Sequence, residues 1–146
     1  MKSPIHSRSA RATLIGLLAL AAFACAAPDT VKAPSSGRVD LLPLADYPQI
    51  VATQGLHEWL VFSPPSVVPG GEEKPMSVSV PFRSTYDRQP VNLQYRFIFF
   101  DDRGRPLETS PGYRFIHAEP RVQSFLEGNA IQSGAADWRL EIRAAR

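Results

Sequence analysis

The sequence contains very little cysteine, which limits the ways in which the protein can be stabilised. Cys25 is the only cysteine among the 146 residues, so no disulfide bond can form within the chain. A domain of roughly a hundred residues buries about two-thirds of its unfolded surface, which is sufficient without covalent links. Hydrophobic residues make up 44% of the composition, and we therefore expect an ordinary hydrophobic core.

The chain also lacks an excess of charge of one sign. Its formal net charge is +2, but Lys2, Arg8 and Arg11 lie in the first 24 residues, which contain no acidic residue. Without these three, the 16 basic residues become 13 against 14 acidic ones, which gives a net charge of −1. A nearly neutral domain has no electrostatic footprint for a polyanion, so we expect no nucleic-acid partner.

Motifs for catalysis and cofactor binding are missing as well. There is no Gly-x-Ser-x-Gly nucleophile elbow, no Gly-x-Gly-x-x-Gly segment, no phosphate-binding loop and no paired-cysteine motif. His117 and Glu119 can share one strand face, but two groups are too few to hold zinc. We interpret His117 as a solvent-facing strand residue, and we expect neither an enzyme nor a small-molecule cofactor.

The acidic pair Asp101-Asp102 is the best candidate for a set of metal ligands, but its surroundings argue against one. Arg103 occupies the place where a calcium loop needs a third oxygen ligand. Two acids followed by Arg103 and Gly104 instead suit a type I turn with the glycine in the left-handed region. The pattern predicts a turn and no metal site.

The first 24 residues have the pattern of a signal peptide. Met1–Arg11 is basic and polar, and Ala12–Ala24 is apolar over a length that fits the roughly 7–15 residues of a signal-peptide core. That length is too short for a membrane-spanning helix, which needs about 20 residues. We therefore assign residues 1–24 to a lipoprotein signal peptide.

The segment ending at Cys25 resembles a bacterial lipobox, where a peptidase cuts before the cysteine and acyl chains such as palmitate are attached. Ala22 stands where leucine is usual. Ala26 follows Cys25 instead of aspartate, and this favours the outer membrane over the inner one. We predict an outer-membrane lipoprotein facing the periplasm, anchored through Cys25. Cleavage by an ordinary signal peptidase near Ala24 would instead give a soluble periplasmic protein.

Residues 25–45 are expected to form a flexible linker behind the anchor, because they are rich in small residues and proline and have no periodicity. About twenty such residues span on the order of 25 Å. The linker would keep the domain, residues 46–146, close to the membrane but free to turn.

The longest strand signal in the chain runs from Val91 to Phe100. Apolar or aromatic residues occupy every second position, and polar residues alternate with them up to Arg96. This period of two is typical of a strand with one face on a core. At Ile98 and Phe100 both faces become apolar, as expected of a central strand. The residues predicted to face the core are Val91, Leu93, Tyr95, Phe97 and Phe99.

Shorter strand signals, separated by proline and glycine turns, surround this segment. The last one alternates Trp138, Leu140 and Ile142 with charged residues. The 14 prolines favour short strands, because proline ends helices. We predict an all-β fold, a small antiparallel β-sandwich of six to seven strands. The other expected strands cover residues 48–53, 58–62, 76–85, 113–118 and 121–127, with residues 66–68 as a continuation of the strand 58–62 at an edge.

The polar faces of two expected strands give the chain its most suggestive surface feature. Arg139, Glu141 and Arg143 share a face of the last strand, and Gln94 and Arg96 share a face of the longest one. If the two strands lie in one sheet, these five side chains form a mixed-charge patch. Such a patch is either a solvated face that hinders aggregation or a face that binds a partner.

The stretch Tyr95–Gly104 resembles the Tyr-Arg-Phe-x-Trp-x-Asp-x-x-Gly segment of the YcfL-type lipoproteins, an uncharacterised family of proteobacterial envelope proteins. Phe99 stands where that family often has tryptophan. Ala130–Arg143 is similar to the family's final strand, and the resemblance covers residues 76–143. It implies an immunoglobulin-like sandwich on a lipid anchor in an envelope-maintenance context, and it implies no reaction.

These features predict a lipid-anchored, non-catalytic protein-interaction module in envelope assembly or maintenance, with an envelope protein as partner besides the membrane. The alternative is a module that binds peptidoglycan or another glycan, since Trp59, Trp138 and the other aromatic residues can stack on sugars. The alternation of the aromatic residues with polar ones favours a core position for them instead.

Overall fold

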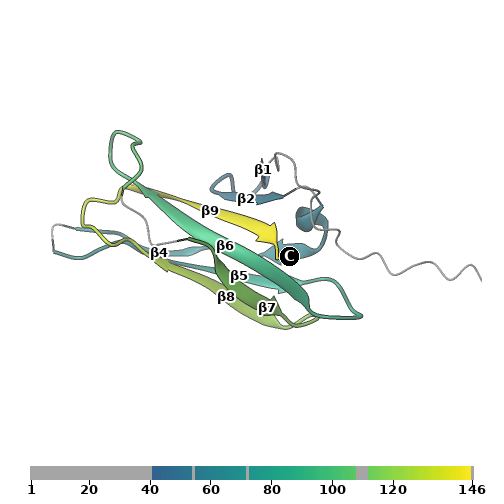
Figure 1. Ribbon diagram of the computed structural model, residues 1–146. Helices are drawn as coiled ribbons and strands as arrows, with labels where there is room; N and C mark the ends of the chain where they lie inside the picture. Colours follow the sequence, from purple (N-terminus) through teal and green to yellow (C-terminus); the bar gives the residue numbers. More distant parts are fainter. Residues whose placement is uncertain (1–40, 54, 72, 108–111, 146) are drawn as a thin grey trace, which may run out of the picture.

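The computed structural model describes residues 41–53, 55–71, 73–107 and 112–145 (Figure 1). The predicted signal peptide, Cys25 and most of the predicted linker lie outside these residues. Within the described residues, no helical segment is long and apolar enough to cross a membrane.

Nine strands and one short 3-10 turn make up the described part of the chain. The turn, η1, covers Leu56–Glu58. The strands are β1 (Leu41–Pro43), β2 (Ile50–Thr53), β3 (Leu60–Phe62), β4 (Ser66–Val68), β5 (Ser77–Ser84), β6 (Val91–Phe100), β7 (Arg114–Ala118), β8 (Gln123–Asn129) and β9 (Asp137–Ala144).

The strands form two sheets that pack as a sandwich. The first sheet has the order β1-β2-β9-β6-β7. In the second sheet β5 is central: β8 runs along one side of it, while β3 and β4 share the other side, one at each end. β6 and β5 therefore occupy interior positions in their sheets (Figure 1). The predicted all-β sandwich is confirmed.

One strand pair differs from the antiparallel prediction. β2 runs parallel to β9, with Ile50 opposite Leu140 and Ala52 opposite Ile142, whereas the other paired strands are antiparallel. A parallel pair needs a long connection, and here most of the domain lies between the two strands. No local sequence pattern sets the direction of such a pair.

The strand β1 corrects the boundary predicted between linker and domain. It lies inside the range 25–45 that was assigned to the linker, so residues 41–43 belong to the folded part and not to a flexible linker. Leu42 pairs with Ala52, and the Leu44 amide donates to the Ile50 carbonyl oxygen at 3.0 Å. A three-residue strand that ends in proline has no readable periodicity, so only its tertiary pairing reveals it. The structure has nine strands in its described part, where six to seven were predicted. β1 and β4, both short edge strands, are two of the additional ones.

The core lies between the sheets and is centred on β6. All five residues of β6 that were predicted to face inward are at most 8% exposed. Phe97 lies at the middle of the aromatic packing, with its ring centroid 6.1 Å from that of Phe99 and 5.9 Å from that of Trp138. The inward residues of β5 and β9 meet them there, namely Val78, Val80, Phe82, Leu140 and Ile142.

Candidate functional site

The outer face of β6 and β9 carries all five side chains that the sequence singled out as a possible partner face. The two strands are antiparallel neighbours. Gln94 lies opposite Arg143, Arg96 opposite Glu141, and Ile98 opposite Arg139. We call this surface, formed by Gln94, Arg96, Arg139, Glu141 and Arg143, the arginine face.

Glu141 is the internal anchor of the arginine face. It is only 7% exposed, although it lies on the outer side of the sheet. Both Nε and Nη2 of Arg96 lie 2.7 Å from its Oε2 atom, and the Tyr113 hydroxyl donates to the same oxygen at 3.1 Å. A buried carboxylate is stable only with such partners. Glu141 therefore positions its neighbours and offers little surface to a partner.

Tyr113 holds the two central arginines in place. The Arg143 guanidinium lies 3.7 Å from the centre of the Tyr113 ring, and that of Arg96 lies 4.8 Å from it. Arg143 also donates through Nε to Oε1 of Gln94 at 2.7 Å. Burial, followed by the nearby Glu141 carboxylate, raises the pKa of Tyr113 above its ordinary value of 10.0. The phenol thus stays protonated at neutral pH and remains a donor to Glu141.

Arg139 extends the face toward the end of β6. Its guanidinium lies 5.4 Å from the centre of the Phe100 ring, a cation–π distance. Among the described residues, no carboxylate forms an ion pair with Arg139 or Arg143. The face therefore has three guanidinium groups against one buried carboxylate and is positively charged.

Phe115 is the residue of this surface that the sequence interpretation missed. It lies on β7 opposite Gln94, and its side chain is 71% exposed. The alternation in this segment could have revealed it. Phe115 lies two residues from both Tyr113 and His117, on the same side of the strand, whereas the buried Ala118 lies on the opposite side. Phe115 places a large exposed ring at the rim of the arginine face.

The histidine and acidic groups that were considered as metal ligands have structural neighbours instead. His117 Nδ1 lies 2.6 Å from Oδ1 of Asn92, and its Nε2 lies 3.6 Å from Glu119. Within the described residues, no group of three or more His, Cys, Asp and Glu side chains is arranged to hold a metal ion.

Asp101 shapes the turn after β6, as the sequence predicted. Its Oδ1 atom accepts hydrogen bonds from the amides of Arg103 at 2.9 Å and Arg105 at 2.8 Å. Gly104 has a φ of 73° and donates its amide to the Asp101 carbonyl oxygen at 3.0 Å. The hydrogen bond from the Arg105 amide is the largest cause that lowers the pKa of Asp101. All of its oxygen contacts serve the turn.

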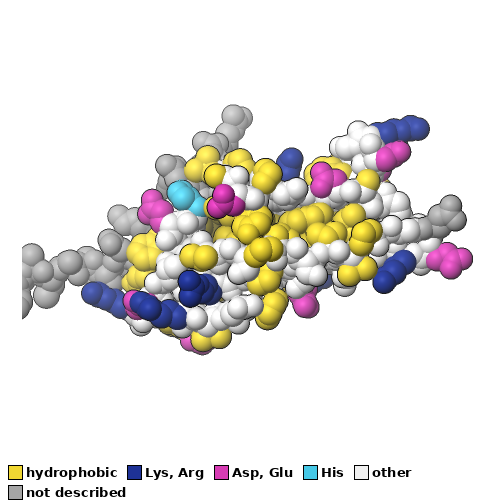
Figure 2. Space-filling view, turned by 180° about the vertical axis from the view of Figure 1, so that it is seen from behind, with side chains coloured by type: hydrophobic (Ala, Val, Ile, Leu, Met, Phe, Trp, Pro, Cys, Tyr) yellow, Lys and Arg dark blue, Asp and Glu magenta, His cyan; other side chains and the backbone are white. Residues whose placement is uncertain are grey.

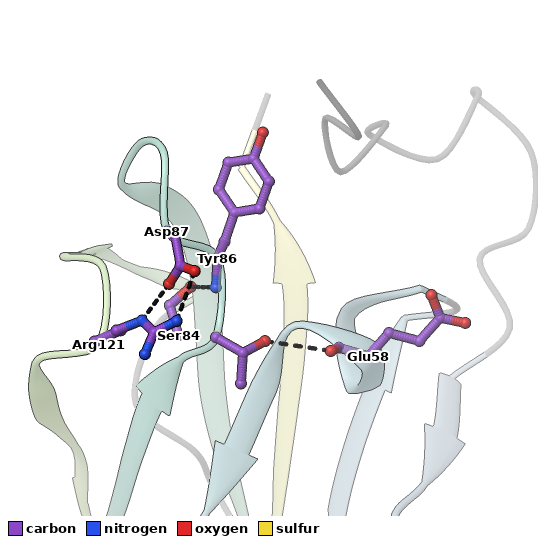
Figure 3. Close-up of polar contacts among 6 residues, drawn as sticks. Glu58, Ser84, Tyr86, Asp87 and Arg121 are labelled. Atoms are coloured by element: carbon purple, nitrogen blue, oxygen red, sulfur yellow. Dashed lines mark hydrogen bonds and ion pairs between the residues drawn. The ribbon is translucent and has the colours of Figure 1, made fainter. Parts of the chain in front are cut away.

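A second polar cluster closes one end of the sandwich (Figure 3). Asp87, in the β5–β6 connection, receives two hydrogen bonds from Arg121, in the β7–β8 turn, including one from Nη2 at 2.6 Å. Arg121 has a positive φ of 59°, and its amide donates to the Ser84 carbonyl oxygen at 3.0 Å. The Tyr86 amide donates to the Ser84 hydroxyl at 3.1 Å. These contacts fix the β5–β6 and β7–β8 connections to each other and to the end of β5.

The fold and the arginine face define a small β-sandwich domain with arginine side chains and an exposed phenylalanine on one sheet surface. Residues 49–144 match the family described as Protein of unknown function (DUF1425). The chain belongs to this family. An uncharacterised family was expected from the sequence, whereas the narrower likeness to the YcfL-type lipoproteins stays a prediction.

Two crystal structures are similar to the domain. The Campylobacter jejuni protein cj0090 has a TM-score of 0.55 and 19% identity, and the match covers 66% of this chain and 98% of that one. A DUF1425 family member from Shewanella sp. pv-4 has a TM-score of 0.51 and 15% identity, over 77% of this chain and 94% of that one. Among curated proteins, none matches the chain. These likenesses show the fold.

Proposed function

We propose that the protein is a non-catalytic module that docks a partner protein on its arginine face. The observation that carries this proposal is the exposed Phe115 ring beside three guanidinium groups on one open sheet surface. Arginine and aromatic residues are enriched at protein interfaces and supply most of the binding energy there. Phe115 is 71% exposed, which is more than any other large hydrophobic side chain among the described residues.

The face is also preorganised for binding. Arg96 is held by Glu141, and Arg143 is held by Gln94 and the Tyr113 ring. Each flexible side chain that must be ordered on binding costs about 0.5–1.5 kcal/mol. Arginines that are already fixed in the free protein avoid part of that loss.

The charge of the face indicates the chemistry of the partner. The only carboxylate within it is buried and paired, so its exposed groups are cationic. We infer an acidic protein surface as the partner, with an apolar contact for Phe115. Association with such a surface becomes slower as salt screens the charges.

The site of action follows from the sequence N-terminal to the described residues. The signal-peptide pattern and Cys25 support an outer-membrane lipoprotein facing the periplasm, with a soluble periplasmic protein as the alternative. The partner would then be an envelope protein, and the resemblance to envelope lipoproteins supports a task in envelope assembly or maintenance.

The alternative of a glycan-binding module has less support from the geometry. Trp138 is only 6% exposed and packs on Phe97. Trp59 is half-buried, and its ring is nearly perpendicular to that of Tyr86, with the two ring centroids 4.9 Å apart. A buried and a half-buried tryptophan offer less ring surface to a sugar than exposed rings would.

Photo-crosslinking in living cells tests this proposal. A photoreactive amino acid at position 115 should capture a discrete protein, and the same group in place of Phe125, which is 51% exposed on β8, should not. Purified peptidoglycan sacculi should fail to retain the protein. Retention on sacculi together with no crosslink at position 115 would favour the glycan-binding alternative and overturn the proposal.

A further inference from the structure

A second surface, independent of the arginine face, is an apolar groove of about 570 Å³ between the edge strands β1 and β3. Its walls are residues 42–47 on one side, and His57 with residues 60–62 on the other. Leu60, only 3% exposed, lies deepest among the β3 residues. The groove is open to solvent and lies at the edges of both sheets.

The β3 wall of this groove has unpaired backbone groups. The Thr85 amide donates to the Trp59 carbonyl oxygen at 2.8 Å, and the Ser63 amide donates to the Pro81 carbonyl oxygen at 3.0 Å. Alternate residues of an antiparallel strand direct their N–H and C=O groups to opposite sides. The backbone N–H and C=O groups of Leu60 and Phe62 therefore point away from β5 and toward the groove. No strand in the described part of the chain pairs with this side of β3.

The β1 wall, by contrast, is blocked. The Leu44 amide donates to the Ile50 carbonyl oxygen, so the backbone N–H and C=O groups of Leu42 and Leu44 point toward β2. The backbone groups of Leu41 and Pro43 point to the free edge of the strand. Pro43 has no N–H group, and proline on an edge strand hinders further pairing. An added strand can therefore hydrogen-bond to β3 but not across Pro43 of β1.

Exposed hydrophobic side chains continue along this side of the molecule. Leu42, Val61, Val67 and Val68 are each at least 40% exposed and lie on β1, β3 and β4. Figure 2 shows a band of hydrophobic side chains running along the face that is seen from behind, with most of the charged groups beside it. An open, apolar strand edge promotes aggregation unless another segment covers it.

The charges at the groove specify its occupant further. Among the described residues that line the groove, Asp46 is the only acidic one and none is Lys or Arg, and Glu58 is exposed next to His57. We propose that an extended segment of a partner protein, with alternating apolar residues and a lysine or arginine near one end, adds to β3 as an extra strand. Its backbone pairs with Leu60 and Phe62, its apolar side chains enter the groove, and its cation faces Asp46.

Hydrogen exchange measured by NMR on the purified full-length chain tests the proposal. The probe is the capped peptide Lys-Val-Thr-Val-Thr-Val-Lys. At saturation it should slow exchange of the Leu60 and Phe62 amides about tenfold. The Val61 amide, which already faces β5, should change much less. The same peptide methylated at every backbone nitrogen should fail, because it keeps the side chains but has no N–H donors.

Two matched variants test the location. Val61→Lys, at the groove, should weaken binding of the peptide at least fivefold, whereas Val68→Lys, on β4 with nearly the same exposure, should change it less than twofold. Both positions are exposed, so both variants should fold.

Three results would overturn the proposal. The first is a detergent such as decyl maltoside filling the groove while the peptide leaves Leu60 and Phe62 unprotected, which would indicate an acyl-chain site. The second is protection that rises with protein concentration without peptide, which would indicate a second copy. The third is concentration-independent protection without peptide, which would indicate that the chain's own N-terminal segment covers the edge.

Discussion

Glu141 shows how a single residue can change its role between sequence and structure. In the sequence it is one of three alternating charged residues and is expected to face solvent. In the structure Arg96 and Tyr113 cover it, so that it is only 7% exposed. The sequence could not reveal this, because Tyr113 and Glu141 are 28 residues apart and the register of three strands brings them together. Strand alternation assigns a face, and burial on that face depends on the neighbours.

Gly128 is a residue whose importance only the packing reveals. A Cβ atom added to it would lie 2.4 Å from the Phe97 ring, closer than any real contact. We expect Gly128→Ala to lower the free energy of unfolding by about 1–3 kcal/mol, because the core has to shift to relieve the clash. Urea unfolding measures this. Gly71→Ala, whose Cβ would meet nothing within 4 Å, should change stability by less than about 0.5 kcal/mol.

The ion pair of Asp87 and Arg121 makes stability depend on pH in a defined direction. The hydrogen bond from Arg121 is the largest cause that lowers the pKa of Asp87 below its ordinary value of 3.8. A carboxylate with a lowered pKa stabilises the folded state above pH 3.8, and this contribution is lost as the pH falls through the lowered value. Thermal unfolding of the protein and of Asp87→Asn should therefore differ most at neutral pH and converge toward pH 3. A difference that stays constant down to pH 3 would contradict this role.

At the scale of elements, β6 and β9 were predictable and their register was not. Both strands have clear alternation, and every core-facing residue predicted for β6 is buried. β7 and β8 lie between them in the chain, so no hairpin loop fixes which residues face each other. The arginine face was therefore predicted on the condition that the strands are neighbours. The orientation of Phe115 and the parallel pairing of β2 depend on contacts distant in the sequence.

Two substitutions distinguish the strand β6 from the turn that follows it. Phe99 is only 3% exposed, and Phe99→Asp should unfold the domain because it places an unpaired charge in the core. Asp102 is exposed in the turn, and Asp102→Asn should change stability by less than about 0.5 kcal/mol. Circular dichroism and urea unfolding measure both. A large loss from Asp102→Asn would indicate that this acid binds a ligand.

At the scale of the whole molecule, the domain offers two surfaces on different sides of the sandwich. The arginine face lies on the outer side of the first sheet, and the groove lies where β1 and β3 border both sheets. β1 is also where the described chain begins, so the proposed tether from Cys25 would enter next to the groove. The two surfaces are far enough apart in the topology for variants of one to leave the other intact.

The membrane anchor predicted at Cys25 is tested by the intact mass of the mature protein. We expect a chain that begins at Cys25 and is heavier than its sequence by the mass of attached acyl chains. Cys25→Ala should move the protein out of the membrane fraction. An unmodified chain that starts at or after Cys25 would show cleavage by an ordinary signal peptidase and a soluble periplasmic protein.

The most direct test of docking on the arginine face is affinity purification of the membrane-anchored protein from its own cells, with quantitative mass spectrometry. We predict an acidic envelope protein that co-purifies with the natural chain and falls at least tenfold with the double substitution Phe115→Ala and Arg139→Glu. Its recovery should also fall as salt rises. Phe125→Ala, an exposed aromatic on the other sheet, should leave its recovery unchanged. Equal recovery of all partners with the double variant and the natural chain would contradict the account.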